Sequence, residues 1–576
     1  MQLVKGANPV AWSVLHASRA LVISNAIMQA APAAQKSSPP MSLTLPPRCV
    51  DVLIVGAGFT GLCMLHKARA MGLAAQLIEA APSVGGTWYH NRYPGARVDI
   101  QSLEYSFEFS AELQQEWRWS ERYAAQAELL RYANHVADRF ALRDGIALNT
   151  RLAHAHWDDE AQRWQASTQA GERWSARFMV MACGPLSTPN MPHFEGQQDF
   201  AGPVFHTAQW PHEAVDFSGM RVGVIGTGSS GVQAIPLIAQ QAAALTVFQR
   251  TATYAVPAHN AALDAGYEAQ VKADYAGFRA RNKLMRGGFG SDVPINNQSA
   301  LTATPAEREA EFERRWRIGG FSLLAAFNDL FTSNEANDLA AEFVRGKIRS
   351  IVRNPATAAA LSPTHAIACK RLCVDSGYYD TFNRDNVRLV DISRHGIARI
   401  TATGVIAGGE EHALDALVLA TGFDAMTGTL MRLDLRGRGG VSIQQKWHAG
   451  PLNYLGLMIE GFPNLFNPVG PGNTAAFTNV IVAIEHHVNW IADCIAHLDA
   501  SGHRTIEPSA QAEAEWVRYV NRIAAQTIML GCNSWYLGAN VPGKPRIFMP
   551  LTGGFPAYVE KCAEVVAQGY AGFELG

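Results

Sequence analysis

The strongest constraint on the fold of this chain is a glycine-rich turn that occurs twice in the same setting. Residues 50–79 read as an apolar strand (VDVLIV), a GxGxxG turn, a helix and a second apolar strand, and residues 221–249 repeat that order. A strand, a glycine turn, a helix and a strand are typical of a dinucleotide-binding βαβ unit. One GxGxxG is weak support, but two copies in this context predict two nucleotide-binding domains in one chain.

The backbone of each turn is suited to a pyrophosphate. The first glycine permits the tight turn, the second lets the backbone approach the phosphates, and the third allows close packing of helix on strand. The helix N-terminus then attracts the negative charge. The cofactor-binding candidates are therefore Gly56, Gly58, Phe59, Thr60 and Gly61 in the first unit, and Gly226, Thr227, Gly228, Ser229, Ser230, Gly231 and Gln233 in the second.

The end of the second strand in each unit distinguishes the two nucleotides. Glu79 lies roughly 20 residues after the first glycine of its unit, where a carboxylate accepts hydrogen bonds from a ribose 2′-hydroxyl. The matching position of the second unit holds the neutral Gln249, followed by Arg250 and Thr251. A carboxylate would repel a 2′-phosphate, whereas a guanidinium binds it. The first unit is therefore predicted to bind FAD and the second NADPH.

The pattern between the two units and after them sets the predicted fold class. Segments of residues 257–368 show apolar residues at spacings of three and four with charged faces, which predicts helices. We expect an α/β protein with two Rossmann-like dinucleotide-binding domains and a helical insertion in the NADPH domain. The expected boundaries are a disordered tail at 1–48, an FAD domain at 49–190 and 424–576, an NADPH domain at 191–256 and 369–423, and the insertion at 257–368.

Composition excludes several other classes of protein. The 576 residues are 48% hydrophobic and 17% charged with a net charge of -2, an ordinary globular balance that gives no attraction for nucleic acid. No apolar run reaches the roughly 18 residues that span a bilayer, and no Cys/His cluster has the spacing of a metal site. We expect a cytoplasmic monomer or weak homo-oligomer without metal, nucleic-acid or membrane partners.

Two features of the chain leave alternatives open. Residues 1–48 are rich in Ala, Ser and Pro and faintly resemble an export signal, but the apolar stretch is short and interrupted, so a disordered tail or a start at Met41 is the preferred interpretation. The 8 cysteines are scattered and form no CxxC pair. We expect them to be buried or half-buried thiols in a reducing compartment.

One further motif identifies a family. The segment 200–211, FAGPVFHTAQWP, resembles the FxGxxxHxxxW fingerprint, followed by Pro or Asp, of the Baeyer–Villiger monooxygenases, with His206 and Trp210 at its defining positions. It stands just before the second glycine turn, as in that family. Related flavin-containing monooxygenases that act on nitrogen or sulfur usually have Tyr or Phe in place of Trp210. The chain is most similar to the group that includes phenylacetone, cyclohexanone and steroid monooxygenases.

Other segments share this resemblance, which covers nearly everything after residue 48. The segment 85–99 resembles the flavin-contacting segment, 370–386 the catalytic-arginine segment and 420–422 (ATG) the interdomain signature, while Trp535 lies in a segment resembling the C-terminal loop that covers NADP. There are departures: residues around Asp99 differ from those of relatives, and NTAAFTN (473–479) replaces a SPSALSN-like run. Substrate choice therefore cannot be transferred from any relative.

The resemblance implies an activity and its site. The family converts a ketone and O2 into an ester or lactone with FAD and NADPH, through a C4a-peroxyflavin and a Criegee adduct. By this resemblance Arg371 and Asp99 are the catalytic pair, Lys370 joins Arg250 at the NADPH 2′-phosphate, and His206 belongs to the interdomain hinge. The resemblance also places Gly86, Thr87, Trp88, Asp99, Tyr105 and Trp535 at the cofactors and Phe477 in the substrate pocket.

Three rival functions are each opposed by residues of the chain. A flavin-containing monooxygenase that oxygenates amines or sulfides is the main alternative, opposed by Trp210 and the Arg371 segment. A disulfide reductase of the same fold needs a redox-active cysteine pair near the first glycine helix, where Cys63 stands alone. A non-catalytic flavoprotein is opposed by the intact set of Asp99, Arg371 and Trp535.

Overall fold

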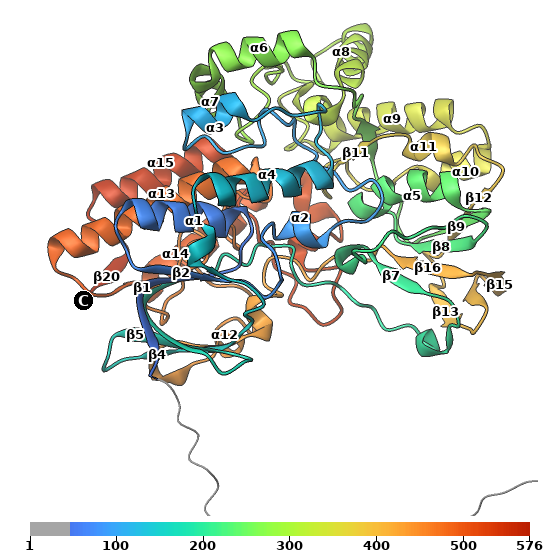
Figure 1. The fold of residues 1–576 in the computed structure, drawn as a ribbon. Helices are drawn as coiled ribbons and strands as arrows, with labels where there is room; N and C mark the ends of the chain where they lie inside the picture. The colour runs from blue at the N-terminus through green and yellow to red at the C-terminus, as the bar shows by residue number, and fades with distance from the viewer. Residues whose placement is uncertain (1–45) are drawn as a thin grey trace, which may run out of the picture. The chain divides into compact units, whose positions relative to one another are not determined.

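The computed structural model of the protein describes residues 46–576. The predicted tail at 1–48 lies outside this range up to residue 45, and Arg48 already begins strand β1 (Arg48–Val55). The described residues form two separate nucleotide-binding-type sheets flanked by helices, which confirms the predicted α/β class (Figure 1). Within residues 46–576, no helix combines the length and the hydrophobicity that a membrane crossing requires, and no three His, Cys, Asp or Glu side chains cluster as metal ligands.

The first sheet holds the first glycine turn at the carboxyl end of β1. Its strand order is β17-β4-β5-β6-β1-β2-β3, with β18 beside β6. The end of β1, residues 52–55, is buried on both faces: Val52 and Ile54 belong to the core under the helices, and Leu53 and Val55 belong to a second core on the opposite face. The other strands are β2 (Ala75–Ile78), β3 (Ile146–Ala147), β4 (Leu152–Asp158), β5 (Arg163–Thr168), β6 (Arg173–Val180), β17 (Asp434–Arg436) and β18 (Leu465–Phe466).

Helices from both ends of the chain cover this sheet. Figure 1 shows α1 (Phe59–Ala70), α4 (Gln126–Arg139) and α13 (Val480–Ser501) on the same side of it. The larger apolar core lies between these helices and the sheet. Residues after 424 thus complete the sheet and the core that the first 130 residues begin, which is why the first unit is discontinuous in sequence.

The second sheet holds the second glycine turn at the carboxyl end of β8. Its order is β12-β9-β8-β16-β7, and every pair is parallel. Helix α5 (Ser229–Gln241) follows the turn and packs against α11 (Tyr378–Thr381) and the sheet in a second core. The strands are β7 (Val204–His206), β8 (Arg221–Ile225), β9 (Ala244–Gln249), β12 (Val387–Asp391) and β16 (Ala416–Leu419).

Helices dominate the segment between β9 and β12, as the periodicity predicts. Helix α8 begins with a capping box formed by Thr304 and Glu307, a sequence signal for a helix start. Strands β10 (Ala255–Pro257) and β11 (Cys373–Asp375) pair in parallel and bring the two ends of the segment together. The helices are α6 (Ala265–Ala273), α7 (Tyr275–Lys283), α8 (Pro305–Ile318), α9 (Asn334–Ile351), α10 (Pro355–Leu361) and α11 (Tyr378–Thr381).

The remaining elements are short strands, helices and single helical turns. The strands are β13 (Ile397–Ile400), β14 (Gly404–Ala407), β15 (Glu410–Ala413), β19 (Ile506–Pro508) and β20 (Phe573–Leu575). The α-helices are α2 (Thr87–His90), α3 (Ala111–Glu116), α12 (Ile443–Lys446), α14 (Ala510–Ala524) and α15 (Phe555–Ala567). The 3-10 turns are Arg143–Gly145, Gln197–Asp199, Thr207–Gln209, Gly320–Ala325, Leu430–Arg432, Arg438–Gly440, Ile528–Gly531 and Trp535–Leu537.

Candidate active site

The two glycine turns have nearly the same geometry. Gly56 and Gly226 both adopt φ of 108°, in the region that side chains disfavour. A Cβ atom at Gly56 would lie 2.7 Å from the carbonyl oxygen of Ala182, and one at Gly226 would lie 2.5 Å from that of Ala420. Each first glycine is therefore required by backbone conformation and by a neighbouring strand at once.

The other glycines of the turns divide into packed and open positions. A Cβ atom at Gly61 would collide with the carbonyl of Gly56, and one at Gly231 with that of Gly226. A Cβ atom at Gly228 would meet nothing within 4 Å, and one at Gly58 would meet only Gly86, at 3.6 Å. The open glycines lie where a pyrophosphate would approach the backbone.

The helices that follow both turns begin without a side-chain cap. The N-cap residues of α1 and α5 are Gly58 and Gly228, which have no side chain to accept the first free N–H groups. Helices α8, α9 and α13 are capped by Thr304, Ser333 and Asn479 instead. Uncapped N–H groups beside an open glycine fit the phosphates of a dinucleotide, so both units of this structure suit such a cofactor.

The predicted flavin-contacting segment meets the first turn. A Cβ atom at Gly86 would lie 2.8 Å from the Cα atom of Gly58, so the two glycines touch. Thr87 is exposed beside them at the start of α2. Tyr105 packs edge-on against Trp88 and Phe59, with ring centroids 6.0 and 6.1 Å apart.

Two of the candidate residues in the first turn have side chains in the protein core. The ring of Phe59 is buried against Phe107 and Tyr132, and Thr60 is buried as well. Only their backbone N–H groups therefore remain for a phosphate. Their predicted role in cofactor binding rests on the main chain.

The ends of the second strands differ between the units. Both carboxylate oxygens of Glu79 accept backbone N–H groups, from Ala57 at 2.6 Å and from Ala81 at 2.7 Å. Gln249 is also buried, but its amide donates to the carbonyl of Ala360 at 2.8 Å, away from its own turn. The first unit thus presents a fixed carboxylate, and the second presents none.

Cations take the place of that carboxylate in the second unit. Arg250 and Thr251 are exposed just beyond β9. Burial and the neighbouring charge of Arg250 both lower the pKa of Lys370. These two basic groups therefore lie near each other although they are far apart in sequence. The carbonyl of Thr251 accepts the hydroxyl of Thr227 at 3.0 Å, which fixes the strand end to the turn.

The polar residues at the start of α5 bind mainly to protein. Ser229 lies 3.5 Å from the sulfur of Cys373. The amide of Gln233 donates to the carbonyl of Arg97 at 3.1 Å and accepts the hydroxyl of Tyr93 at 2.8 Å. Gln233 therefore joins the second unit to the predicted flavin segment, a use that its motif position does not reveal.

Arg371 and Asp99 form a bidentate ion pair across the two units. Nε and Nη2 of Arg371 each donate to a different carboxylate oxygen of Asp99, both at 2.9 Å, and Nη1 donates to the carbonyl of Ala476 at 3.0 Å. The guanidinium also lies 4.7 Å from the ring of Phe321. Burial opposes the charge, but the attraction and hydrogen bonds of Asp99 outweigh it and raise the pKa of Arg371, so the cation persists at every physiological pH.

His206 contacts the two segments that connect the units, one at Asn190 and the other at Thr421. Its Nε2 lies 3.0 Å from the hydroxyl of Thr421 and 3.3 Å from the carbonyl of Asn190, while Nδ1 accepts the N–H of Ala208 at 3.0 Å. This pattern requires the neutral ring with its proton on Nε2, and burial lowers the pKa of His206 accordingly. Trp210 is instead a core aromatic, buried with its ring centroid 5.3 Å from that of Phe205.

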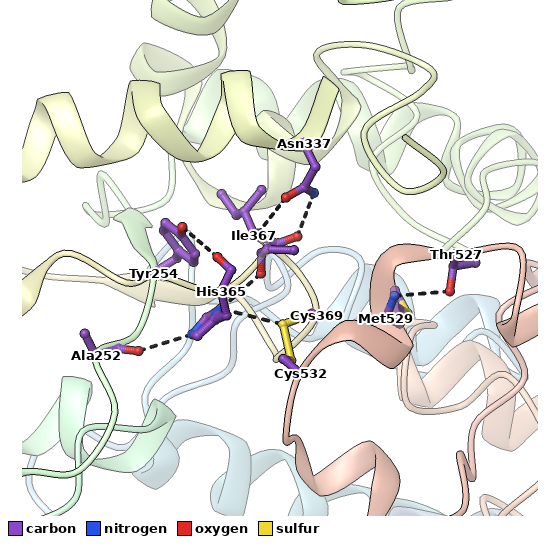
Figure 2. The surroundings of a disulfide bond; sticks show 10 residues. Ala252, Tyr254, Asn337, His365, Ile367, Cys369, Thr527, Met529 and Cys532 are labelled. Atoms are coloured by element: carbon purple, nitrogen blue, oxygen red, sulfur yellow. Dashed lines mark hydrogen bonds between the residues drawn. A yellow bond between two sulfur atoms is a disulfide. The ribbon is translucent and has the colours of Figure 1, made fainter. Parts of the chain in front are cut away.

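The predicted C-terminal loop is covalently tied to the arginine segment. Cys369, which directly precedes Lys370, forms a disulfide with Cys532 near the start of that loop (Figure 2). The expectation that all cysteines are thiols is therefore wrong for this pair, and Cys49 is exposed rather than buried. The two partners lie 163 residues apart, and only the tertiary structure brings them within bonding distance.

The loop also docks onto the connection between the units. Asn540 donates to the carbonyl of Phe423 at 2.7 Å, and Lys544 forms an ion pair with Asp424 at 2.7 Å. Trp535 is half-buried, with its ring centroid 4.3 Å from that of Tyr536. The loop therefore touches both the ATG connection and the arginine segment.

A largely apolar cavity opens beside the Arg371–Asp99 pair. Phe477 lines this cavity and packs against Tyr536 with ring centroids 4.8 Å apart. The helical segment supplies most of the other apolar walls. Sequence reasoning missed these residues because their periodicity is that of an ordinary helical core. These walls include Met285, Phe289, Val293, Ile295, Phe321, Leu324 and Phe331.

The protein is similar along most of its length to known flavoprotein monooxygenases. Residues 53–273 match the family described as pyridine nucleotide-disulphide oxidoreductase. The chain is 42% identical over 526 residues to a Baeyer-Villiger monooxygenase of Pseudooceanicola batsensis (90% of this chain, 95% of that protein). It is 39% identical over 531 residues to the phenazine N-monooxygenase PhzNO1 of Lysobacter antibioticus (91% and 97%). A solved structure of oxidized steroid monooxygenase bound to NADP shares 49% identity with a TM-score of 0.87 (92% and 99%).

Proposed function

This chain belongs to the Baeyer–Villiger monooxygenases, FAD-containing and NADPH-dependent enzymes that convert a ketone and O2 into an ester or lactone, and from that premise we propose that Arg371 is its catalytic cation and Asp99 the residue that positions it. The observation that carries the proposal is the bidentate pair of these two side chains on the wall of an apolar cavity. A fixed cation beside a water-poor space is what an oxygen transfer to a carbonyl requires.

The residues present fit both cofactors. In our proposal the first turn, Gly86 and the carboxylate of Glu79 hold FAD, while the second turn, Arg250 and Lys370 hold NADPH. Bound at these places, the two cofactors supply the hydride and the activation of O2. The uncapped starts of α1 and α5 support both assignments.

Arg371 then stabilises negative charge on oxygen as it develops. Its guanidinium cannot lose a proton under working conditions, and two of its nitrogen atoms are occupied by Asp99. Its orientation is therefore set before a substrate arrives, which avoids reorganisation during the reaction. The apolar cavity walls exclude water and strengthen this electrostatic effect.

Separating the two half-reactions tests the proposal. In Arg371→Ala, NADPH is expected to reduce the flavin as before, whereas ester or lactone formation falls by about 100- to 1,000-fold and hydrogen peroxide is released instead. Anaerobic stopped-flow absorbance measures the first step, and gas chromatography measures the product. Arg371→Lys keeps the charge but loses the bidentate pair and is expected to be intermediate. Retained product formation in Arg371→Ala would remove Arg371 from this role.

A second candidate activity is oxygenation of nitrogen or sulfur. The phenazine N-monooxygenase relative favours it, whereas Trp210 of the fingerprint favours ketones. Oxygenation of a sulfide by the Arg371→Ala variant with loss of ester formation would show that the two activities make different demands on the same cavity.

We also propose a cytoplasmic monomer or weak homo-oligomer, on the basis of composition. The disulfide between Cys369 and Cys532 opposes the cytoplasmic assignment, because such bonds are rare in that reducing compartment, so the redox state of this pair decides the question. Labelling of free thiols in freshly lysed cells, with and without prior reduction, tests the compartment. Light scattering after size-exclusion chromatography tests the oligomeric state.

A further inference from the structure

Arg286 is a cation of the cavity that has no acidic partner among residues 46–576. Arg286 follows α7 and lines the cavity with Phe331, whose ring centroid lies 5.1 Å from its guanidinium carbon. Nη2 donates to the carbonyl of Thr552 at 2.8 Å, and no Asp or Glu of the described chain pairs with this guanidinium. Most of its N–H donors therefore remain free toward the cavity.

The main chain of Arg286 is held by the start of α15. The carbonyl of Arg286 accepts the N–H of Phe555, the first residue of α15, at 2.9 Å. The side chain keeps accessible surface, while the protein around it lowers the pKa of Arg286 because burial disfavours the charged form. Arg286 is thus an anchored cation that a ligand in the cavity can reach.

The other basic groups of the cavity are already accounted for. Arg371 is held by Asp99, Arg122 donates to the carbonyl of Ile318, and Lys370, beside Arg250, belongs to the proposed NADPH site. Arg122 and the buried carboxyl of Glu104 lie within each other's field.

The acidic groups of the cavity, Asp99 and Glu104, also have partners other than Arg286. Glu104 accepts the N–H of Gly290 at 2.7 Å, and burial raises its pKa to about 7 in spite of this bond. Its carboxylate does not approach Arg286 within the 4 Å of an ion pair. No acidic group of the cavity therefore neutralises Arg286.

We propose that Arg286 binds a carboxylate on the ketone substrate, so that the enzyme acts on apolar keto acids whose acid group lies remote from the reacting carbonyl. The inference rests on the proposed function, because it uses the same cavity for the ketone. Arg286 is exposed, so a ligand carboxylate can reach its guanidinium and form charge-assisted, bidentate hydrogen bonds beside the apolar and aromatic walls. Phe289, Val293 and Ile295 supply an apolar wall for the carbon chain between the two groups.

The test uses methyl-ketone carboxylic acids of increasing chain length, each paired with its methyl ester. The ester keeps the shape and the ketone but removes the charge. In the wild-type holoenzyme we expect kcat/KM to favour the acid over the ester, with an optimum at one chain length, since both ends must reach their sites together. In Arg286→Met the ratio of acid to ester is expected to fall by about 10- to 100-fold, the range of hydrogen bonds to charged groups; in Arg286→Lys it falls less.

Arg281→Met is the matched control, because Arg281 is exposed on α7 and lies outside the cavity. It is expected to leave the ratio at the wild-type value. Equal turnover of acid and ester by the wild type, or an unchanged ratio in Arg286→Met, would overturn the inference while the proposed function stands. If no acid, ester or simple ketone gives an oxygenated product although NADPH reduces the flavin, the proposed function itself fails. Flavin absorbance and thermal melting show whether each variant is folded.

Discussion

The two nucleotide-binding units share a turn but differ in how each one is completed. In the first, Glu79 at the end of β2 accepts N–H groups from Ala57 and Ala81, residues of its own unit. In the second, Gln249 points to Ala360, and the neighbouring basic group is Lys370, which follows the whole helical segment. The turn geometry suits a dinucleotide in both units, and we propose that the strand end and its distant neighbours decide which one binds.

This difference has a consequence for how the two nucleotides are held. The first site is closed by local contacts, as expected for a cofactor that stays bound. The second is assembled from segments far apart in sequence, including the disulfide-linked pair at 369 and 532, as expected for a nucleotide that must enter and leave. Long-range assembly allows a site to open without unfolding the domain around it.

The largest effects are expected from bulky substitutions at the third glycine of each turn, because each should abolish binding of one cofactor only. In Gly61→Val the added side chain collides with the carbonyl of Gly56, and a cost above about 3 kcal/mol is expected to yield protein without flavin. In Gly231→Val the same collision occurs with Gly226, but the purified protein should stay yellow and lose reduction by NADPH. Visible absorbance and anaerobic reduction measure the two effects. Flavin loss in both variants would break the comparison.

Removal of the disulfide tests whether the second site depends on long-range contacts. Cys532→Ser is expected to lower the free energy of unfolding by about 2–4 kcal/mol, the usual range for a native disulfide. It should also raise KM for NADPH while the protein keeps its flavin, because the bond adjoins Lys370 rather than the first turn. Chemical denaturation and steady-state kinetics provide the measurements. Cys49→Ser, at an exposed thiol, is the control; an equal loss of stability there would contradict this account.

The charge at the second strand end should set coenzyme preference. Arg250→Ala is expected to reduce the preference for NADPH over NADH by about 1–3 kcal/mol, the scale of a charged hydrogen bond. The ratio of kcat/KM for the two coenzymes measures it. Arg353→Ala, an exposed arginine elsewhere in the same half of the chain, serves as the control. If the coenzyme ratio stays at its wild-type value in Arg250→Ala, another group recognises the 2′-phosphate.

The smallest effect is expected from substitution of Glu79, at the end of β2, on the affinity for FAD. Glu79→Gln keeps the shape but replaces one carboxylate oxygen by an amide that cannot accept an N–H group, so FAD should dissociate more readily by about 1–2 kcal/mol. Fluorescence of released flavin on dilution reports the change. The coenzyme ratio should not move, and a shift in it would show that the two sites are not independent.

Local chemistry allowed much of this arrangement to be predicted. Strand, glycine turn and helix lie next to one another in the chain, so their geometry follows from neighbouring residues, and the α/β class follows from finding them twice. The pairing of Arg371 with Asp99 came from resemblance to a family, not from spacing. The residues that sequence reasoning missed, such as Phe321 against Arg371 and Arg286 in the cavity wall, lie in ordinary helical patterns that carry no signal of a site.

The sequence by itself therefore determined the two dinucleotide turns and the chemical character of the residues at each strand end, because these depend on a few consecutive residues. Only the tertiary structure decided that Cys369 meets Cys532, that Gln233 joins the two units, and that Arg286 faces the cavity without a carboxylate. Such contacts join segments separated by more than 100 residues, and their formation depends on how whole sheets and helices pack rather than on any local preference.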